Sequence, residues 1–63
     1  MKDILTVKDV VQMTDGVISE ATLRWYPARG QGGPRSGSLG RRVVYRRSDV
    51  EAWIAAAFED GVA

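Results

Sequence analysis

The 63-residue chain is 44% hydrophobic and carries nine basic and eight acidic side chains, but it contains neither cysteine nor histidine. The missing cysteine excludes disulfides and thiolate metal ligands, and the missing histidine removes the commonest metal ligand and the usual general base near neutral pH. The longest uncharged apolar run, residues 53–58, is far shorter than the ~20 residues that span a bilayer. We therefore expect a single domain over residues 1–63 that has no signal peptide, membrane segment, metal or cofactor and is not an enzyme.

The charges are distributed unevenly along the chain. Residues 21–47 contain seven arginines and no acidic residue, whereas the remainder holds both lysines and all eight acidic residues. The near-neutral total therefore hides a strongly cationic central segment. A cationic block without interspersed acid is typical of a surface that binds nucleic acid.

A first short helix is predicted over residues 7–14. Thr6 is a favourable N-cap, and apolar residues follow it at helical spacing. Asp15 and Gly16 should end this helix, because glycine readily takes the left-handed conformation that a tight turn needs.

A second helix is predicted over residues 20–26, with Ser19 as its N-cap and Pro27 at its end. Leu23 and Tyr26 are three residues apart and therefore lie on one face of this helix. Two short helices joined by a glycine-containing turn form the helix-turn-helix pattern. Helices of this size need a platform, which the rest of the chain must supply.

The second half of the chain predicts a loop, a hairpin and a third helix. Residues 28–37 are rich in glycine and should form a loop. Residues 38–39 and 42–46 read as short strands around a tight turn at Gly40-Arg41. A capped amphipathic helix follows and begins at Arg47 or Ser48. The predicted fold is mainly α with a small β-hairpin, in the order α-α-β-β-α.

The predicted core collects the apolar residues that these elements should turn inward. In the return strand, alternation should point Val43 and Tyr45 inward and Val44 outward. The full set is Leu5, Val7, Val10, Val11, Val17, Leu23, Tyr26, Leu39, Val43, Tyr45, Val50, Trp53 and Ile54.

Two stretches of the sequence carry a resemblance to a known family. The segments ILTVKDVVQM…GVISEATLRWY and LGRRVVYRRSDVEAWI resemble the MerR-like winged helix-turn-helix of phage excisionases, over residues 4–54. The TLRWY segment followed by an arginine-rich wing looks particularly like excisionases of actinobacterial phages. The turn at residues 17–19 and the loop at residues 27–37 are longer here than is usual in that family.

The resemblance implies an accessory DNA-binding protein, or recombination directionality factor, in the cytoplasm of a bacterial host. Phage excisionases bind as several copies to repeated sites on double-stranded DNA, bend the DNA, and direct an integrase toward prophage excision. A phage integrase is therefore an expected partner. The charge asymmetry further suggests head-to-tail self-association, in which the acidic first helix and C-terminal tail of one copy meet a basic or apolar surface of the next. Val44 and Trp25 are expected contacts.

The expected DNA-binding residues fall into three groups. In a winged helix-turn-helix the second helix enters the major groove, where Arg24 would contact guanine and Glu20 the amino group of cytosine. The hairpin tip should reach the minor groove, and further arginines should contact phosphates. The recognition helix would use Ser19, Glu20, Ala21 and Arg24, the wing Gly40, Arg41 and Arg42, and the phosphate contacts Arg29, Arg35, Arg46 and Arg47.

Several alternatives remain open at this stage. A small transcriptional regulator would use the same surface, and a protein-interaction module could direct the arginines at an acidic partner. The arginine cluster could also be no more than a solvated face, and Trp25 could serve packing, a protein partner or DNA. The glycine-rich run at residues 30–33 lacks the Lys-Ser/Thr and the preceding strand of a phosphate-binding loop. Tyr26 and Tyr45 lack the activating residues of a recombinase nucleophile.

Overall fold

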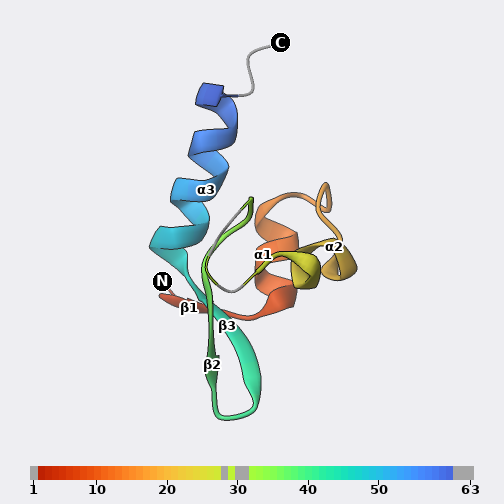
Figure 1. Ribbon diagram of the computed structural model, residues 1–63, viewed down its shortest axis with the longest axis vertical. Coiled ribbons are helices and arrows are strands. Elements are labelled where there is room, and N and C mark those ends of the chain that lie inside the picture. Colours follow the sequence, from red (N-terminus) through yellow and green to blue (C-terminus); the bar gives the residue numbers. More distant parts are fainter. Residues whose placement is uncertain (1, 28, 30–31, 61–63) are drawn as a thin grey trace.

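The computed structural model describes residues 2–27, 29 and 32–60 and shows three helices around a three-stranded antiparallel sheet (Figure 1). This architecture confirms the predicted order of two helices, a hairpin and a third helix, and it adds a strand at the N-terminus. Part of the glycine-rich run (residues 30–31) and Gly61 lie outside the described residues. The elements are β1 (Ile4–Leu5), α1 (Val7–Met13), α2 (Glu20–Trp25), β2 (Ser36–Leu39), β3 (Arg42–Arg46) and α3 (Arg47–Asp60).

Helix α1 begins at a complete capping box. The Thr6 hydroxyl accepts a hydrogen bond from the Asp9 backbone N–H at 3.2 Å, and the Asp9 carboxylate accepts one from the Thr6 N–H at 2.9 Å. Two of the free N–H groups at the helix start are satisfied in this way. The same carboxylate forms a 2.9 Å ion pair with Lys2, so one acid ties the N-terminal segment to α1.

The turn between α1 and α2 uses the left-handed conformation that the sequence predicts. Asp15 and Gly16 have φ angles of 54° and 79°, and the Gly16 N–H donates to the Val11 carbonyl at 3.0 Å. Helix α2 then starts at Ser19, whose hydroxyl accepts from the Thr22 N–H at 3.2 Å. Both predicted N-caps are therefore confirmed.

Strand β3 is the centre of the sheet, with β1 and β2 on its two sides. The hairpin register pairs Leu39 with Arg42, so the connection is a two-residue turn. Gly40 has a φ of 66° whereas Arg41 does not have a positive φ, which is the pattern of a type II′ turn. The turn therefore forms where the sequence predicts it.

Strand β1 is an element that the sequence pattern did not predict. It is two residues long, and its Leu5 pairs with Tyr45 of β3. Next to it the Arg47 N–H donates to the Asp3 carbonyl at 2.8 Å, and the Arg47 Nε donates to the Lys2 carbonyl. The start of α3 thus holds the N-terminal segment against the sheet.

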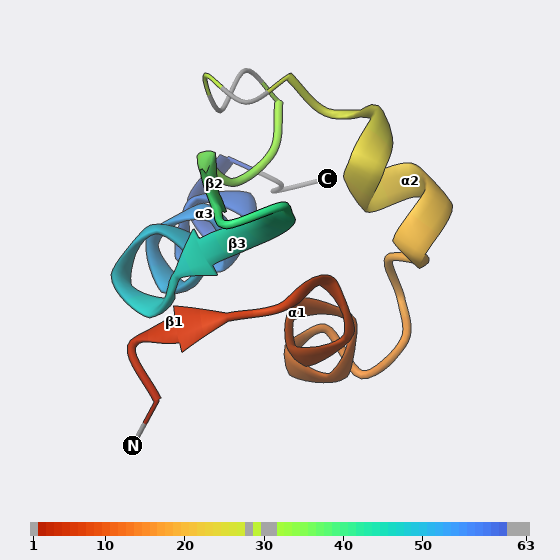
Figure 2. The ribbon, with the colours of Figure 1, turned by 90° about the horizontal axis from the view of Figure 1, so that it is seen from below.

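The core lies where α1, α2 and the start of α3 meet the inner face of β3 (Figure 2). Three predicted core residues are wrong: Val17, Leu39 and Val43 are 81%, 60% and 45% exposed. Val17 lies in the interhelical turn, Leu39 lies on the face of the sheet opposite the buried Tyr45, and Val43 shares the face of Tyr45 but lies next to the hairpin turn. The buried set is Leu5, Val7, Val10, Leu23, Tyr45 and Val50, and the predicted Tyr26, Trp53 and Ile54 pack half-buried against it. The predicted Val11 is half-exposed and belongs to neither group.

Tyr26 connects α2, the glycine-rich loop and α3. Its ring lies edge-on to the ring of Trp53, with centroids 6.0 Å apart, and edge-on to that of Trp25. On its other side Gly33 approaches so closely that a Cβ there would lie 2.4 Å from the ring. Gly33 and Pro34 are buried, so this end of the loop is part of the packed body.

Helix α3 leaves the body after its first turns. Val50 is fully buried, whereas Phe58 is 80% exposed, and Figure 1 shows the helix rising away from α1 and α2. The helix is 14 residues long. No helix in the described part of the chain combines the length and the apolar character that crossing a membrane would require.

Candidate nucleic-acid interface

Helix α2 presents its polar side to solvent because Leu23 anchors the opposite side in the core. Leu23 is 1% exposed. Ser19, Ala21 and Arg24 are exposed and Glu20 is half-exposed. The N-terminal half of the helix, which carries the predicted base-contacting residues, is therefore available to a ligand.

The hairpin tip carries the second group of predicted residues. Gly40, Arg41 and Arg42 are all exposed. They lie at the end of the hairpin that extends away from the helices in Figure 1. A cationic tip projecting from a small body has the shape of a wing.

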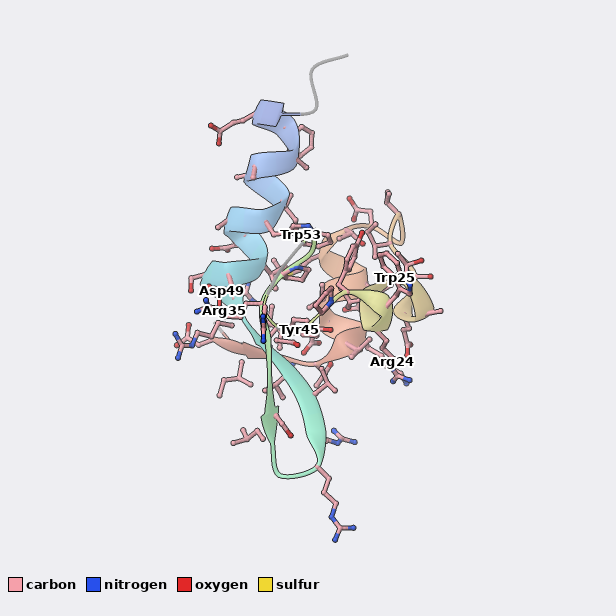
Figure 3. The ribbon with its side chains drawn as sticks, viewed as in Figure 1. Arg24, Trp25, Arg35, Tyr45, Asp49 and Trp53 are labelled. Atoms are coloured by element: carbon pink, nitrogen blue, oxygen red, sulfur yellow. The ribbon has the colours of Figure 1, made fainter. Side chains whose placement is uncertain are left out.

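One groove brings the helix and the wing together. Its volume is about 510 Å³. Figure 3 shows that the Arg24 side chain extends from α2 on the side where the hairpin lies. Four of the residues predicted to contact DNA, two from α2 and two from the hairpin tip, line this groove. Its lining residues are Thr6, Val7, Lys8, Glu20, Arg24, Arg41, Arg42 and Val43.

Lys8 is a lining residue that the sequence analysis missed. It lies in the first turn of α1, is exposed, and adds a fourth cation to the groove. Its position two residues after the Thr6 cap could have predicted this role, because the first helix of a helix-turn-helix crosses the DNA backbone.

The electrostatics of the groove are dominated by positive charge. Glu20 is the only acid among its described lining residues, and it approaches Arg24 at 3.6 Å across one turn of α2. Such an exposed pair contributes little to stability, so Arg24 can exchange it for a base or a phosphate at small cost. Behind the groove, burial raises the pKa of Tyr45, and the positive charge of Arg24 acts in the opposite direction.

The remaining predicted phosphate contacts do not line this groove. Arg35 and Arg46 line a second groove with residues of β2. Arg47 bonds to the Lys2 carbonyl, lies 3.8 Å from the Glu51 carboxylate and is only 25% exposed at its side chain. Arg29 is exposed in the loop. The cationic block of the sequence is therefore divided among different surfaces.

Nothing in the described residues suggests a metal site: no group of three or more potential acidic, histidine or cysteine ligands comes together there. The groove instead combines guanidinium groups, one amine and one carboxylate around an open depression. These are hydrogen-bonding and charge-neutralising groups suited to phosphates and base edges.

A half-exposed helix start beside a cationic hairpin tip defines a winged helix-turn-helix. The chain belongs to the helix-turn-helix domain family, whose pattern it matches over residues 4–57. Membership of this family implies sequence-specific binding of DNA, and such domains are typically not enzymes. No curated protein and no solved structure matches the chain at a significant level.

Proposed function

We propose that the protein is an excisionase, a DNA-binding protein that turns an integrase toward excision. The observation that carries the DNA-binding part is the shared groove of α2 and the hairpin tip. In this arrangement the start of α2 enters the major groove and the wing lies along the adjacent minor groove or its phosphates. The excisionase part rests on the resemblance of the two sequence stretches.

The residues of the groove divide the work between sequence recognition and positioning. Arg24 makes a bidentate contact with guanine and Glu20 accepts from a cytosine amino group, because both side chains start from the exposed side of α2. Ser19 is occupied as a helix cap, and its neighbour Ala21 leaves room for close approach. Lys8 and the wing arginines neutralise phosphates.

The cations that neutralise phosphates set the expected salt dependence. Counting Lys8, Arg41 and Arg42, the logarithm of the binding constant should fall with the logarithm of salt concentration at a slope of roughly −2.7. The larger set of five to seven arginines that the sequence offers would give roughly −4 to −6. The difference arises because Arg35, Arg46 and Arg47 are held elsewhere.

A single domain of this size contacts few base pairs and should bind weakly, so several copies should cooperate on repeated sites. Head-to-tail contact between copies is the form we propose, because acids outside the cationic block, such as Asp15 after α1 and Glu59 in α3, can meet the cationic groove of the next copy. Trp25, which is 79% exposed at the end of α2, is the more exposed of the two expected contacts, since Val44 is half-exposed. On adjacent repeats such contacts would produce a short DNA-bound filament and a bend.

The decisive experiment is a gel shift on duplex DNA that carries an attachment region, with a scrambled duplex of the same length as the control. An excisionase should retard the attachment duplex at a lower protein concentration than the scrambled duplex. The dependence of retardation on protein concentration should also be steeper for the attachment duplex than for a duplex that carries one repeat. Footprints at a promoter, with none at the attachment region, would identify a transcriptional regulator and reject the excisionase assignment. Equal retardation of the attachment duplex and the scrambled duplex would reject sequence-specific binding.

A further inference from the structure

The sheet has a second face, of which the proposed DNA contact uses only Arg42 at the hairpin tip. The register places Ile4, Leu39 and Val44 on the face opposite the buried Tyr45. Ile4 is 53% exposed and Leu39 60% exposed. With the residues of β2 they line a groove of about 270 Å³, which we call the outer sheet groove. An exposed apolar strip over a groove of this kind is typical of a surface that binds a partner.

Strand β2 borders this groove with an unpaired edge. In the sheet that the structure describes, β2 lies at the margin and pairs only with β3. The hairpin closes with the hydrogen-bonded pair Leu39–Arg42, and because such pairs alternate along an antiparallel ladder, Gly37–Val44 is hydrogen-bonded too. The backbone N–H and C=O groups of Ser36 and Ser38 therefore point away from β3, toward the open edge of the sheet.

The composition of β2 leaves this edge accessible. Its first three residues are Ser36, Gly37 and Ser38, which carry none of the charges or prolines that commonly block edge strands. A Cβ added at Gly37 would meet nothing within 4 Å, so there is open space above the strand. The exposure of Gly37 and Ser38 also leaves this part of the edge open to another extended chain.

The charge around the outer sheet groove selects the kind of chain. Arg35 and Arg46 line it together with a single acid, Asp49 at the start of α3; Figure 3 shows Arg35 and Asp49 near each other at this end of the molecule. Neither arginine forms an ion pair with any residue that the structure describes. Two guanidinium groups beside an apolar strip complement an acidic and apolar segment.

We propose that the outer sheet groove binds an extended acidic segment of a partner protein, which adds to the edge of β2 as a further strand. The backbone of the segment pairs with Ser36 and Ser38, its apolar side chains cover Leu39 and Val44, and its carboxylates approach the two arginines. A second copy of this chain fits less well, because pairing β2 with β2 would bring the arginines of both copies together. A DNA backbone would place a polyanion against exposed apolar side chains.

The outer sheet groove shares no lining residue with the DNA-facing groove. DNA and the acidic segment can therefore bind at the same time, on opposite sides of β3. This inference goes beyond the excisionase assignment, and it stands or falls independently of the DNA sequence that the protein recognises.

The test uses the full chain and two short capped peptides, one alternating valine with glutamate and the other alternating valine with lysine. We expect the acidic peptide to shift the backbone NMR signals of Ser36, Ser38 and Val44 and to slow exchange of the two serine amides. The signals of α2 should stay unchanged. The basic peptide should not bind.

Two variants with a matched control examine the edge and the strip separately. Ser38→Pro removes one outward N–H, which an edge strand tolerates, and should weaken peptide binding about three- to tenfold, the effect of one hydrogen bond. Ser38→Thr keeps that N–H and should bind as the unchanged protein does. Leu39→Glu leaves the backbone intact and should weaken binding by more than about tenfold. All three should still retard DNA.

Several outcomes would overturn the proposal. Equal binding of both peptides, or unchanged affinity in Ser38→Pro and Leu39→Glu, would contradict strand addition at a cationic edge. Signal changes at Ser38 that depend only on protein concentration would identify a second copy as the occupant, and the same changes with duplex DNA would identify a DNA surface. Loss of DNA retardation in these variants would instead count against the two-sided arrangement.

Discussion

Tyr45 and Val43 lie two residues apart on the same face of β3, yet Tyr45 is 4% exposed and Val43 45% exposed. The first packs among Leu5, Leu23 and Val50 in the core, whereas the second lines the groove between the wing and α2. One strand therefore serves two regions: a packed junction that holds the helices in place, and a tip that projects from it. Substitutions in the junction should affect folding, and substitutions of the arginines at the tip should affect DNA binding and leave folding unchanged.

The largest expected effect lies in the packed junction. Leu23→Ala removes a side chain that is 1% exposed and should lower the free energy of unfolding by about 2–5 kcal/mol, which is much of the stability of so small a domain. Chemical denaturation followed by tryptophan fluorescence measures it. Val17→Ala is the control: Val17 is 81% exposed, and the loss should be no more than about 0.5 kcal/mol. Similar losses in both variants would contradict the assignment of Val17 to the surface.

The packed junction also includes the end of the glycine-rich loop. Gly33→Ala would place a methyl group 2.4 Å from the Tyr26 ring, and the required displacement should destabilise the fold by about 1–3 kcal/mol. Gly37→Ala meets nothing within 4 Å and is the matched control. If thermal unfolding shows no difference between these variants, the loop does not pack on Tyr26.

At the DNA-facing groove the expected effect is on recognition. Arg24→Ala should reduce the preference for the specific site over random duplex by about 1–3 kcal/mol, with unfolding unchanged because the side chain is exposed. Competition gel shifts measure the preference. A variant that loses affinity equally for specific and random DNA would show that Arg24 contacts phosphate and not a base.

At the wing the expected effect is on affinity for all sequences. Replacing both Arg41 and Arg42 by alanine should weaken binding to most duplexes and flatten the salt slope by about two units. Arg46→Ala is the matched control, because Arg46 lies in the outer sheet groove and its removal should leave the slope unchanged. An equal change in slope for Arg46→Ala would mean that DNA wraps onto the second face.

The smallest expected effect concerns the cap of α1. The Thr6 N–H, followed by Lys2, lowers the pKa of Asp9 from 3.8 to about 2. The folded state therefore binds fewer protons than the unfolded chain between these values, so the stabilisation is complete above about pH 4 and disappears as the pH falls through about 2. Asp9→Asn should flatten the dependence of stability on pH in that interval.

The control for this prediction is Asp15→Asn, at an acid that caps no helix in the described structure. Its curve should follow that of the unchanged protein between pH 4 and pH 2. If Asp9→Asn also follows that curve, the capping carboxylate does not account for the acid sensitivity of the fold.

The features that the sequence predicted correctly depend on nearby residues. Thr6 and Ser19 cap their helices through bonds to residues three positions away, and Gly40 forms the turn that its own conformation permits. Leu23 lies in the core because the apolar face of a short helix is determined by spacing. Such local relations are visible in a single chain.

The features that the sequence did not predict depend on distant contacts. Strand β1 exists because Leu5 pairs with Tyr45, forty residues away in the chain. Leu39 is exposed because its pairing with Arg42 puts it on the face opposite Tyr45. Val43 shares the face of Tyr45, but its exposure depends on how far the hairpin extends beyond the helices, which no local pattern encodes. The same reason explains why Lys8 was missed and why the arginine block separates onto two faces.

The proposed DNA contact requires that α2 and the hairpin tip bind one DNA duplex together. The most direct measurement is backbone NMR of the full chain with the tightest-binding duplex selected from a random pool. We expect signals of residues 19–24 and 40–43 to shift together at one stoichiometric ratio, while Ile4 and Arg46, which line the outer sheet groove, stay unchanged. Shifts confined to one of the two elements, or centred on the opposite face of the sheet, would contradict the claim.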